Sequence, residues 1–385
     1  MIEITDRSKC NGCHACYSIC PRSCIEKKAD SEGFLYPRAD KERCVECGLC
    51  SKVCPIENGK SRSESGTALG YAVMNNDEET RLKSSSGGVF TLIAKQIINS
   101  GGVVVGAAFA DDFRSVHHII IDSENEIEKL RGSKYVQSRI SDTYKRTKQE
   151  LEKGRKVLFT GTPCQIGGLL SYLGKPYDDL FTQDIVCHGV PSPMIWSDYV
   201  DIREKAAGSQ TSNLSFRNKS TGWKSYSVSF EFSNGSNYMQ RSLSDNYMKG
   251  FLKDIYLRPS CYSCAFKTKD RQSDITLADF WGIQTVMPEM DDNKGTSFVW
   301  IHSEKGRKLF EEIKPQVVFK PVEPDTALKF NVSAVKSVEV PQKRQYFFEA
   351  RNNADLEKLI SKLTKEKAGV RLTNFARKVK RKLSR

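Results

Sequence analysis

Two short stretches near the N-terminus, CNGCHACYSICP at residues 10–21 and CVECGLCSKVCP at residues 44–55, repeat one pattern of cysteines. In each copy three cysteines follow at intervals of three residues, and a fourth stands four residues later, directly before proline. Nine of the 13 cysteines of the chain lie between residues 10 and 54. Such crowding is not expected of cysteines scattered through a hydrophobic core, and it indicates a site built from thiols.

This spacing is typical of proteins that carry two 4Fe-4S clusters. Three closely spaced sulfurs converge on one cluster, whereas the cysteine before proline enters the next helix and binds the other cluster. The pattern therefore predicts two interleaved ligand sets. The first set is Cys10, Cys13, Cys16 and Cys54, and the second is Cys44, Cys47, Cys50 and Cys20. Zinc is the alternative, since CxxC pairs also form tetrahedral thiolate sites. Cys24 is left over, and we expect it to be a small buried residue.

The composition indicates a soluble protein of two or three domains. The chain has 385 residues, of which 38% are hydrophobic and 28% are charged. Its longest nearly charge-free apolar run, residues 101–110, is half of the ~20 residues that a membrane-spanning helix needs. The N-terminal residues MIEITDRSKC include acids where a secretory signal would need an apolar segment. We therefore expect a cytoplasmic protein, in which thiols are more often metal ligands or redox groups than disulfides.

The net charge of +13 is unevenly distributed. Residues 367–385 hold eight basic residues and no acids, so most of the surplus lies in this short tail. The remaining chain is only mildly basic, and we expect no nucleic-acid partner. The tail places apolar residues along one helical stripe among cations, which is compatible either with weak peripheral contact to anionic lipid or with a solvated terminal helix.

Beyond the cysteine repeat the chain changes character. A spacer containing FLYPR predicts a strand between the two repeats, and a polar linker follows. From residue 70 onward, strand-like and helix-like segments alternate, as in YAVM, then GGVVVGAAF, then KVLFTG followed by TPCQIGGLLSYL. SYSVSFEF alternates polar and apolar residues and predicts an antiparallel strand, and FVWIHSEKGRKLFEEI predicts a strand and a helix. We expect a mixed α/β fold: a bacterial-type two-cluster ferredoxin domain over residues 1–57, a linker over 58–68, a mixed α/β body over 69–340 and a helical basic tail over 341–385.

The body holds four further cysteines on three separated motifs. The motifs are TGTPCQIGGL (160–169), DIVCHGVPSP (184–193) and RPSCYSCAF (258–266), and SDITLADFWG (273–282) follows them. The thiols are Cys164, Cys187, Cys261 and Cys264. Spacing alone leaves three interpretations open for them, namely a third 4Fe-4S site, a zinc site or simple buried thiols.

These motifs, in this order, resemble the beta-subunit family of coenzyme F420 hydrogenases and dehydrogenases. The family's relatives include the N-terminal half of F420-dependent sulfite reductase and the 7-hydroxymethyl chlorophyll a reductases. The resemblance covers residues from about 84 to about 320, and many members carry an N-terminal two-cluster module. It implies an FAD and an inner 4Fe-4S cluster in the body, so three clusters in all. The four body cysteines would be the ligands of the inner cluster.

The resemblance also implies which segments contact FAD. KSSSGGVF (83–90) and RGSKYVQS (131–138) resemble the FAD-contacting segments of the family, and small residues let backbone amides approach a diphosphate. Neither is a GxGxxG fingerprint, and SSSGG is also compatible with a simple turn before a helix. The predicted cofactor-binding residues are Ser85, Ser86, Gly87, Gly88, Gly132, Ser133, Lys134, Tyr135, Gln137, Thr160, Gly161, Thr162, Asn293 and Lys294.

Two further residues stand beside these motifs. His188 follows Cys187 and is placed either to donate a hydrogen bond to a cofactor or to pack as an ordinary buried histidine. Asp279 is placed either to orient a loop near the flavin or to form a turn. No residue is assigned a catalytic role.

The sequence therefore predicts an iron-sulfur flavoprotein oxidoreductase. In this hypothesis FAD exchanges a hydride with F420 or another reduced coenzyme or substrate, and the clusters pass single electrons to a redox partner such as a ferredoxin or another subunit. The alternative is a polyferredoxin-like electron carrier whose body only scaffolds clusters. A zinc-binding regulatory protein is a third, more remote hypothesis.

Overall fold

The computed structural model describes residues 1–59 and 68–365. The expected linker at 58–68 falls mostly outside the described residues, as does the basic stretch 367–385. The strands are β1 (Ile25–Ala29), β2 (Leu35–Ala39), β3 (Leu69–Asn75), β4 (Val103–Phe109), β5 (Val116–Ile121), β6 (Val157–Gly161), β7 (Leu180–Ile185), β8 (Thr211–Asn218), β9 (Ser227–Phe232), β10 (Asn237–Arg241), β11 (Ile275–Asp279), β12 (Ser297–Ile301) and β13 (Val317–Pro321).

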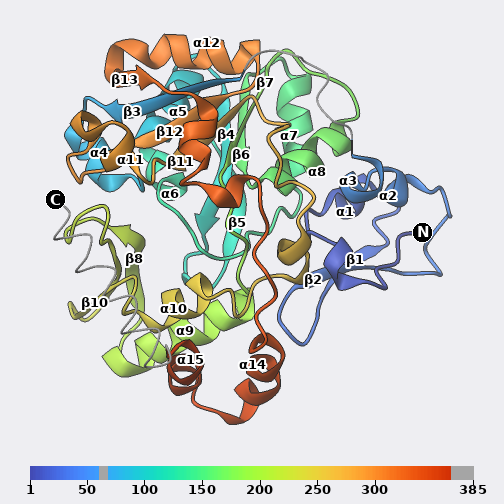
Figure 1. Ribbon diagram of the computed structural model, residues 1–385. Helices are drawn as coiled ribbons and strands as arrows, with labels where there is room; N and C mark the ends of the chain where they lie inside the picture. The colour runs from blue at the N-terminus through green and yellow to red at the C-terminus, as the bar shows by residue number, and fades with distance from the viewer. Residues whose placement is uncertain (60–67, 366–385) are drawn as a thin grey trace.

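Short helices and longer helices connect these strands (Figure 1). They are α1 (Ala15–Ile19), α2 (Leu49–Lys52), α3 (Pro55–Asn58), α4 (Glu78–Lys83), α5 (Val89–Asn99), α6 (Ile127–Leu130), α7 (Thr143–Glu152), α8 (Pro163–Leu173), α9 (Pro193–Ala207), α10 (Asn246–Leu252), α11 (Ile283–Val286), α12 (Glu304–Ile313), α13 (Pro324–Leu328), α14 (Arg344–Ala350) and α15 (Leu356–Thr364). A 3-10 turn, η3 (Pro259–Ser263), carries the first cysteine of the CYSC motif.

An eight-stranded mixed sheet forms the centre of the body, in the order β13-β3-β12-β11-β7-β6-β4-β5. The strands β4, β6, β7 and β11 run parallel to one another, and the outer strands are antiparallel to their neighbours. Val103, Val104 and Val105 of β4 are almost completely buried. A continuous apolar run is what a strand covered on both faces requires.

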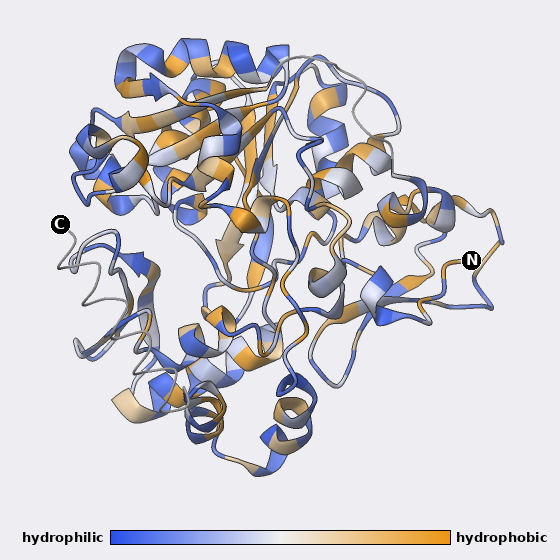
Figure 2. Ribbon diagram, in the orientation of Figure 1, coloured by the Kyte–Doolittle hydropathy of each residue, from blue (hydrophilic) through white to orange (hydrophobic). Residues whose placement is uncertain are grey.

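Helices cover both faces of this sheet. One hydrophobic cluster joins α5, α6 and α12 to the sheet, and another joins α7 and α8 to it. Figure 2 shows hydrophobic strands in the interior and two-sided helices outside them. This arrangement places the carboxyl ends of the parallel strands, where loops gather functional groups, at one edge of the sheet.

The N-terminal module packs directly against the body. It consists of the β1–β2 hairpin and α1 to α3, at the right in Figure 1. Ala15 of α1 is fully buried and belongs to the same hydrophobic cluster as Ile166 and Leu169 of α8. The core of the module is therefore continuous with the core beneath the sheet.

A second lobe lies below the large sheet in Figure 1. The antiparallel sheet β10-β9-β8 packs with α9 and α10, and α14 and α15 complete the same hydrophobic cluster. Trp196 of α9 and Phe347 of α14 are both fully buried in it. Residues 344–364 are thus part of this lobe.

The fold class predicted from the sequence is confirmed. YAVM lies in β3, GGVVVGAAF gives β4, and the KVLFTG and TPCQIGGLLSYL segments give β6 and α8. The alternating SVSFEF segment is β9, paired antiparallel on both sides. None of the helices at residues 1–59 and 68–365 is long and apolar enough to cross a membrane.

Candidate functional site

The first predicted cysteine set lines a single cavity in the N-terminal module. Gly12 and His14 adopt left-handed backbone conformations, with φ of 68° and 62°, and so turn the chain tightly before α1. Cys54 approaches from the start of α3, where Pro55 occupies the first helical position. The cysteines that line the cavity are Cys10, Cys13, Cys16 and Cys54.

The second predicted set lines a second cavity of the module, together with the leftover cysteine. Its thiols are Cys20, Cys44, Cys47 and Cys50, and Cys24 lies beside them. Cys24 is 3% exposed, as expected of a small buried residue. However, its sulfur lies 3.4 Å from the sulfur of Cys20, and its backbone N–H donates to that same sulfur at 3.4 Å. Cys24 therefore belongs to the immediate surroundings of this set.

The four body cysteines line a third cavity. Cys164 lies in the first turn of α8 after β6, and Cys187 follows β7, so both occupy the carboxyl edge of the parallel strands. Cys261 comes from η3, and its sulfur accepts a hydrogen bond from the N–H of Val190 at 3.4 Å. The cavity-lining thiols are Cys164, Cys187, Cys261 and Cys264. The structure thus brings together residues that are up to 100 positions apart.

The three cavities suit metal groups held by thiolates. They are partly open to solvent, and about 480, 370 and 440 Å³ of space not filled by protein atoms lies in and at the mouths of them. Burial raises the pKa of Cys13 and of Cys187 to about 12, and neighbouring thiols of the same set act in the same direction. Such thiols keep their protons at neutral pH unless a cation displaces them, which is how thiolate metal sites form. Four soft ligands at each cavity match the preferences of an iron-sulfur cluster, whereas among the described residues no three or more His, Cys, Asp or Glu side chains are arranged to hold a single metal ion.

One arginine adds a second indication at the third cavity. Arg271 lines the cavity and is 4% exposed. Its Nη1 atom lies 3.8 Å from a carboxylate oxygen of the buried Asp184, but its Nε and Nη2 atoms are buried and have no hydrogen-bond partner among the described residues. Unsatisfied buried donors of a cation are costly, so this side chain suits an anionic group in the cavity. A thiolate-ligated iron-sulfur cluster carries net negative charge, whereas two orphaned donors have no use beside neutral thiols.

The first and third cavities share a wall. Asn11 lines both of them. The module and the body also touch at α8. A Cβ added to Gly168 of this helix would lie 3.1 Å from the sulfur of Cys13. The module therefore presents its first cysteine set to the edge of the body that carries the inner set.

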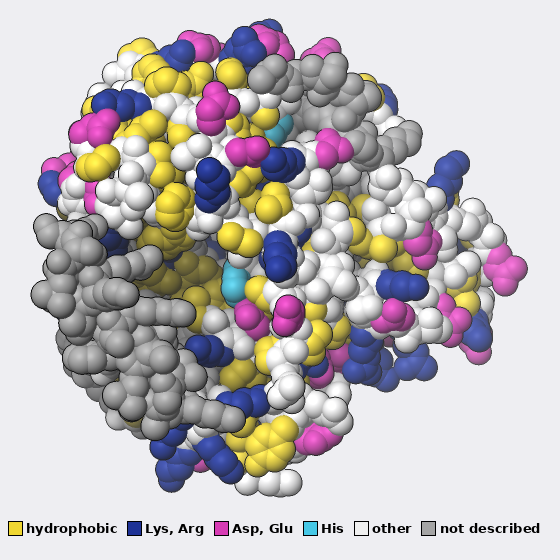
Figure 3. All heavy atoms as spheres, in the orientation of Figure 1, with side chains coloured by type: hydrophobic (Ala, Val, Ile, Leu, Met, Phe, Trp, Pro, Cys, Tyr) yellow, Lys and Arg dark blue, Asp and Glu magenta, His cyan; other side chains and the backbone are white. Residues whose placement is uncertain are grey.

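A separate group of predicted residues meets near the small antiparallel sheet. The backbone N–H and hydroxyl of Ser133 both donate to the hydroxyl of Ser85, at 2.7 and 2.9 Å. Arg217 at the end of β8 donates to the Ser85 carbonyl at 3.0 Å and to the Tyr135 hydroxyl at 3.1 Å. Figure 3 shows a hollow lined by apolar side chains between the layer of the large sheet and the lobe of β8 and α10. The two segments that resemble FAD-contacting loops are thus held side by side.

Arg217 is anchored by a partly buried carboxylate. Its guanidinium makes two hydrogen bonds to Asp279, at 2.8 and 2.9 Å, and the indole N–H of Trp223 donates to the same carboxylate at 2.8 Å. The rings of Trp223 and Trp281 stack in parallel, with centroids 5.1 Å apart. Asp279 therefore orients the loops through Arg217.

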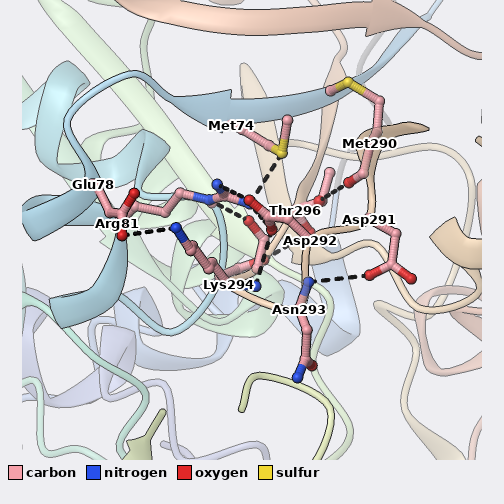
Figure 4. Close-up of polar contacts among 12 residues, drawn as sticks. Met74, Glu78, Arg81, Met290, Asp291, Asp292, Asn293, Lys294 and Thr296 are labelled. Atoms are coloured by element: carbon pink, nitrogen blue, oxygen red, sulfur yellow. Dashed lines mark hydrogen bonds and ion pairs between the residues drawn. The ribbon is translucent and has the colours of Figure 1, made fainter. Parts of the chain in front are cut away.

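The DNKG turn is tied to the SSSGG segment by two cations. Arg81 donates to Asp292 at 2.6 Å and to the Gly295 carbonyl at 2.8 Å (Figure 4). The amine of Lys219 donates to the carbonyls of Arg81, Ser86 and Lys294, at 2.8, 2.6 and 2.7 Å.

The side chains of the turn itself are engaged elsewhere. That of Lys294 pairs with Glu78 at 2.7 Å, and Asn293 Oδ1 accepts from the N–H of Lys224. The turn is therefore part of the framework around the SSSGG segment.

Lys134 has the character of an anion-binding residue. Its amine donates to the carbonyls of Arg131 and Gly132, and in the described part of the chain no carboxylate lies within ion-pair distance of it. Burial lowers its pKa to about 7. A half-buried amine with only neutral partners suits a phosphate group, and Gly88 and Gly132, with φ near 84°, keep both neighbouring loops free of side chains.

The remaining predicted residues occupy different surroundings. Thr160 donates to the Val105 carbonyl, and Thr162 caps α8 and lies 3.2 Å from the sulfur of Cys164. Gln137 contacts the module, because its amide donates to the Asn11 carbonyl at 3.1 Å. His188 Nε2 is paired with Asp254, which gives it a specific partner beside the inner cysteines.

Sequence reasoning did not single out Arg217, Lys219, Arg258 or Arg271. Arg217 and Lys219 stand in FRNKS at the end of a strand, where charged residues are normally solvated, and their partners lie 62 or more residues away. Of these four residues, only Arg258 stands close to a cysteine motif, since it is the first residue of RPSCYSC.

Comparisons with known proteins agree with this arrangement. Residues 71–145 match the family model for the coenzyme F420 hydrogenase/dehydrogenase beta subunit N-term, and residues 154–327 match the model for the C terminus of the same subunit. Residues 9–58 match the 4Fe-4S dicluster domain. No curated protein sequence matches the chain significantly.

Among solved structures, a chain of the F420-reducing NiFe hydrogenase complex from Methanosarcina barkeri is similar to this one. The two are 17% identical, with a TM-score of 0.49 over 75% of this chain and 93% of that chain. The two subunit models together span most of the body and the dicluster model spans the N-terminal module. The chain is thus an iron-sulfur protein with a 4Fe-4S dicluster domain, and it belongs to the coenzyme F420 hydrogenase/dehydrogenase beta-subunit family.

Proposed function

We propose that this chain is an iron-sulfur flavoprotein that passes electrons between a hydride-exchanging FAD site and a redox partner. The observation that carries the proposal is the presence of three cavities, each lined by a predicted set of four cysteines, of which the first and the third share Asn11 in their lining. Two cavities that share a lining residue lie close together, which suits electron transfer between the groups bound in them. We take residues 1–57 as the electron-carrying module and residues 69–340, together with the helices of residues 344–364 that pack on them, as the cofactor-binding body.

The proposed ligand assignments follow the cavities. Each N-terminal cavity would hold one 4Fe-4S cluster in the interleaved pairing, and the third cavity would hold the inner cluster. These groups, when bound, supply single-electron chemistry. Arg271 would offer its orphaned donors to the inner group.

The FAD site is proposed in the hollow beside Ser85 and Ser133. Bound FAD supplies the exchange of a hydride with F420 or with another reduced coenzyme. Lys134 would hold the diphosphate, and Arg217 would keep the two loops in register by binding the Ser85 carbonyl and the Tyr135 hydroxyl. The apolar lining of the hollow would exclude water from the reacting ring.

The redox partner is proposed to dock at the second cavity, on the outer side of the module. Cys47 is exposed there. Met1, Val45 and Leu49 line the same cavity and are 41%, 57% and 38% exposed. Exposed apolar side chains around a ligand cysteine favour a protein partner that buries them while it brings its own redox group close.

Metal and flavin analysis of the anaerobically purified chain tests this function. Three clusters and one FAD per chain are expected. Iron without flavin would instead indicate an electron carrier of the polyferredoxin type, and zinc without sulfide would refute both.

A further inference from the structure

Arg258 lies at the junction between the N-terminal module and the body. It is 1% exposed, one of the largest fully buried side chains of the protein. Its guanidinium donates to the carbonyl of Cys10 at 2.7 Å, to the carbonyl of Leu35 at 3.0 Å and to the side chain of Gln137 at 3.0 Å. It also stacks on the ring of Tyr36, 4.3 Å from the ring centroid. One residue of the body thus forms hydrogen bonds to two separate segments of the module.

In the part of the chain that the structure describes, this buried cation has no carboxylate counterion. At residues 1–59 and 68–365, no aspartate or glutamate oxygen lies within 4.0 Å of its guanidinium, whereas the buried Arg217 has Asp279. Carbonyls and an aromatic ring satisfy its donors but carry no formal negative charge. A fully buried, unpaired cation is strongly unfavourable. An anion is therefore expected beside it.

The nearest candidate anion is the first cysteine set. The Nη2 atom of Arg258 lies 3.5 Å from the sulfur of Cys10. The carbonyl of Arg258 also accepts the N–H of Cys261 at 2.9 Å. A single arginine therefore faces one thiol set and shapes the loop of another.

The backbone of the module makes room for this contact. A Cβ on Gly12 would lie 2.8 Å from the Nη1 atom of Arg258, so any side chain at this position would have to displace the guanidinium. Gly12 also has a left-handed φ of 68°. Glycine at this position lets the Cys10–Cys13 turn close over the guanidinium.

We propose that Arg258 is a positioning residue that holds the first and inner cysteine sites together and, through its uncompensated charge, raises the reduction potentials of the groups bound there. A cation near a redox centre stabilises the reduced, more negative state. This inference rests on the proposed function, because it presupposes clusters at the two cavities. The second N-terminal cavity serves as an internal reference, because none of its cysteines contacts Arg258 in the described chain.

The test is an EPR-monitored redox titration of the anaerobically purified full-length chain, with R258Q, R258K and R344Q. Arg344 also joins body to module, since it donates to Glu32 at 2.7 Å and to the Leu257 carbonyl at 3.1 Å. Its charge is matched by Glu32, which makes it a control for docking alone. Iron is measured in every sample, so that potentials are compared only between proteins with equal cluster content.

R258Q is expected to shift two of the three midpoints to lower potential and to leave the third unchanged. R258K keeps the positive charge but lacks the several donors of the guanidinium, and it is expected to shift the same two midpoints less. If R258Q does not retain its iron, R258K provides the test. R344Q is expected to leave all three unchanged. Unaltered midpoints in an iron-replete Arg258 variant would overturn the inference, as would an equal shift in R344Q. Wild-type protein without clusters would instead refute the proposed function.

Discussion

Gly168 of α8 lies directly against Cys13 of the N-terminal module. A Cβ at Gly168 would come 2.8 Å from the Cβ and 3.1 Å from the sulfur of Cys13, and 2.8 Å from the hydroxyl of Tyr144. The helix that carries Cys164 of the inner set therefore also packs against Cys13 of the first set. Cys164 and Gly168 are four residues apart and so lie one turn apart on the same face of α8, which places the two cysteine sites along one side of this helix.

This contact predicts the effect of filling the space. G168A should destabilise the protein by about 1–3 kcal/mol through overpacking, despite the gain of ~1 kcal/mol that alanine brings to a helix. It should also lower the iron content, because Cys13 must shift. Urea unfolding and iron analysis measure both effects, with S171A on the same helix as the control. A G168A protein that is more stable than wild type and retains all its iron would contradict the packing described here.

The ligand assignment predicts a stepwise loss of iron. C261S should lower the iron content by about one third, from roughly twelve to eight atoms per chain, because it removes one ligand of the inner cluster. C24S should retain the wild-type content, since Cys24 lies beside the second set without being needed in the interleaved pairing. Equal iron loss in both variants, or none in C261S, would refute the assignment.

The Arg217–Asp279 pair predicts coupled effects on stability and flavin. The side chain of Arg217 is 3% exposed and that of Asp279 is 15% exposed. D279N leaves a buried guanidinium without its counterion and should cost roughly 3–5 kcal/mol. The flavin-to-protein ratio should fall with it, because Arg217 holds Ser85 and Tyr135. D325N, in an exposed pair with Lys269, should cost less than about 1 kcal/mol and leave the flavin unchanged. Similar losses in the two variants would rule out a special role for Asp279.

Lys134 predicts a pH dependence of flavin binding. Its pKa in the flavin-free protein is lowered to about 7, so the amine loses its charge as pH rises through that value. A diphosphate attracts only the charged form, and FAD affinity should therefore fall as pH increases from 6 to 8. K134Q should bind FAD more weakly at pH 6 and show a flatter profile. Flavin fluorescence titrations at several pH values measure this, and parallel profiles would place the diphosphate elsewhere.

Lys134 also makes the stability of the flavin-free protein depend on pH, and this stability should rise with pH where FAD affinity falls. Because its folded pKa lies below the unfolded value of 10.5, the unfolded chain binds more protons between about pH 7 and 10.5. The contribution of Lys134 to stability is therefore present at high pH and is lost as pH falls toward 7. Denaturant unfolding of wild type against K134Q over this range should show the difference growing in favour of wild type as pH rises.

The exposed apolar side chains near Cys47 predict the place of electron exit. V45E should slow electron transfer to a ferredoxin acceptor about tenfold, equivalent to ~1.4 kcal/mol of docking energy, because a charge replaces an apolar contact. Transfer to methyl viologen should be unchanged, since a small dye needs no docked surface. V340E, at a residue that is 62% exposed in another part of the chain, is the control. An equal effect of V340E would place the partner elsewhere.

The sequence was most informative where chemistry imposes spacing. The cysteines from Cys10 to Cys54 could be paired from their spacing alone, because a cubane cluster dictates which sulfurs converge. The strands around β4 and β6 were predictable for a similar reason, since strands buried on both faces must be continuously apolar. Cys164 and Cys261 required the family resemblance, because nothing in their spacing brings β6, β7 and η3 to one place.

The charged framework could not be predicted. Arg217 meets Asp279 only because β8 from one lobe lies beside β11 from the other. Arg258 reaches Cys10 across 248 positions of the chain. Such pairs depend on how the domains pack, and a single sequence has no periodicity that reports this. Gln137 illustrates the same point, since it stands in a loop that resembles an FAD segment but contacts the module.

The central claim is that three clusters and a flavin operate within one chain. Iron, acid-labile sulfide and acid-released FAD, measured together on anaerobically purified protein, test it most directly. The account predicts roughly twelve iron and twelve sulfide atoms and about one FAD per chain. Protein with eight or fewer iron atoms and no flavin would contradict it.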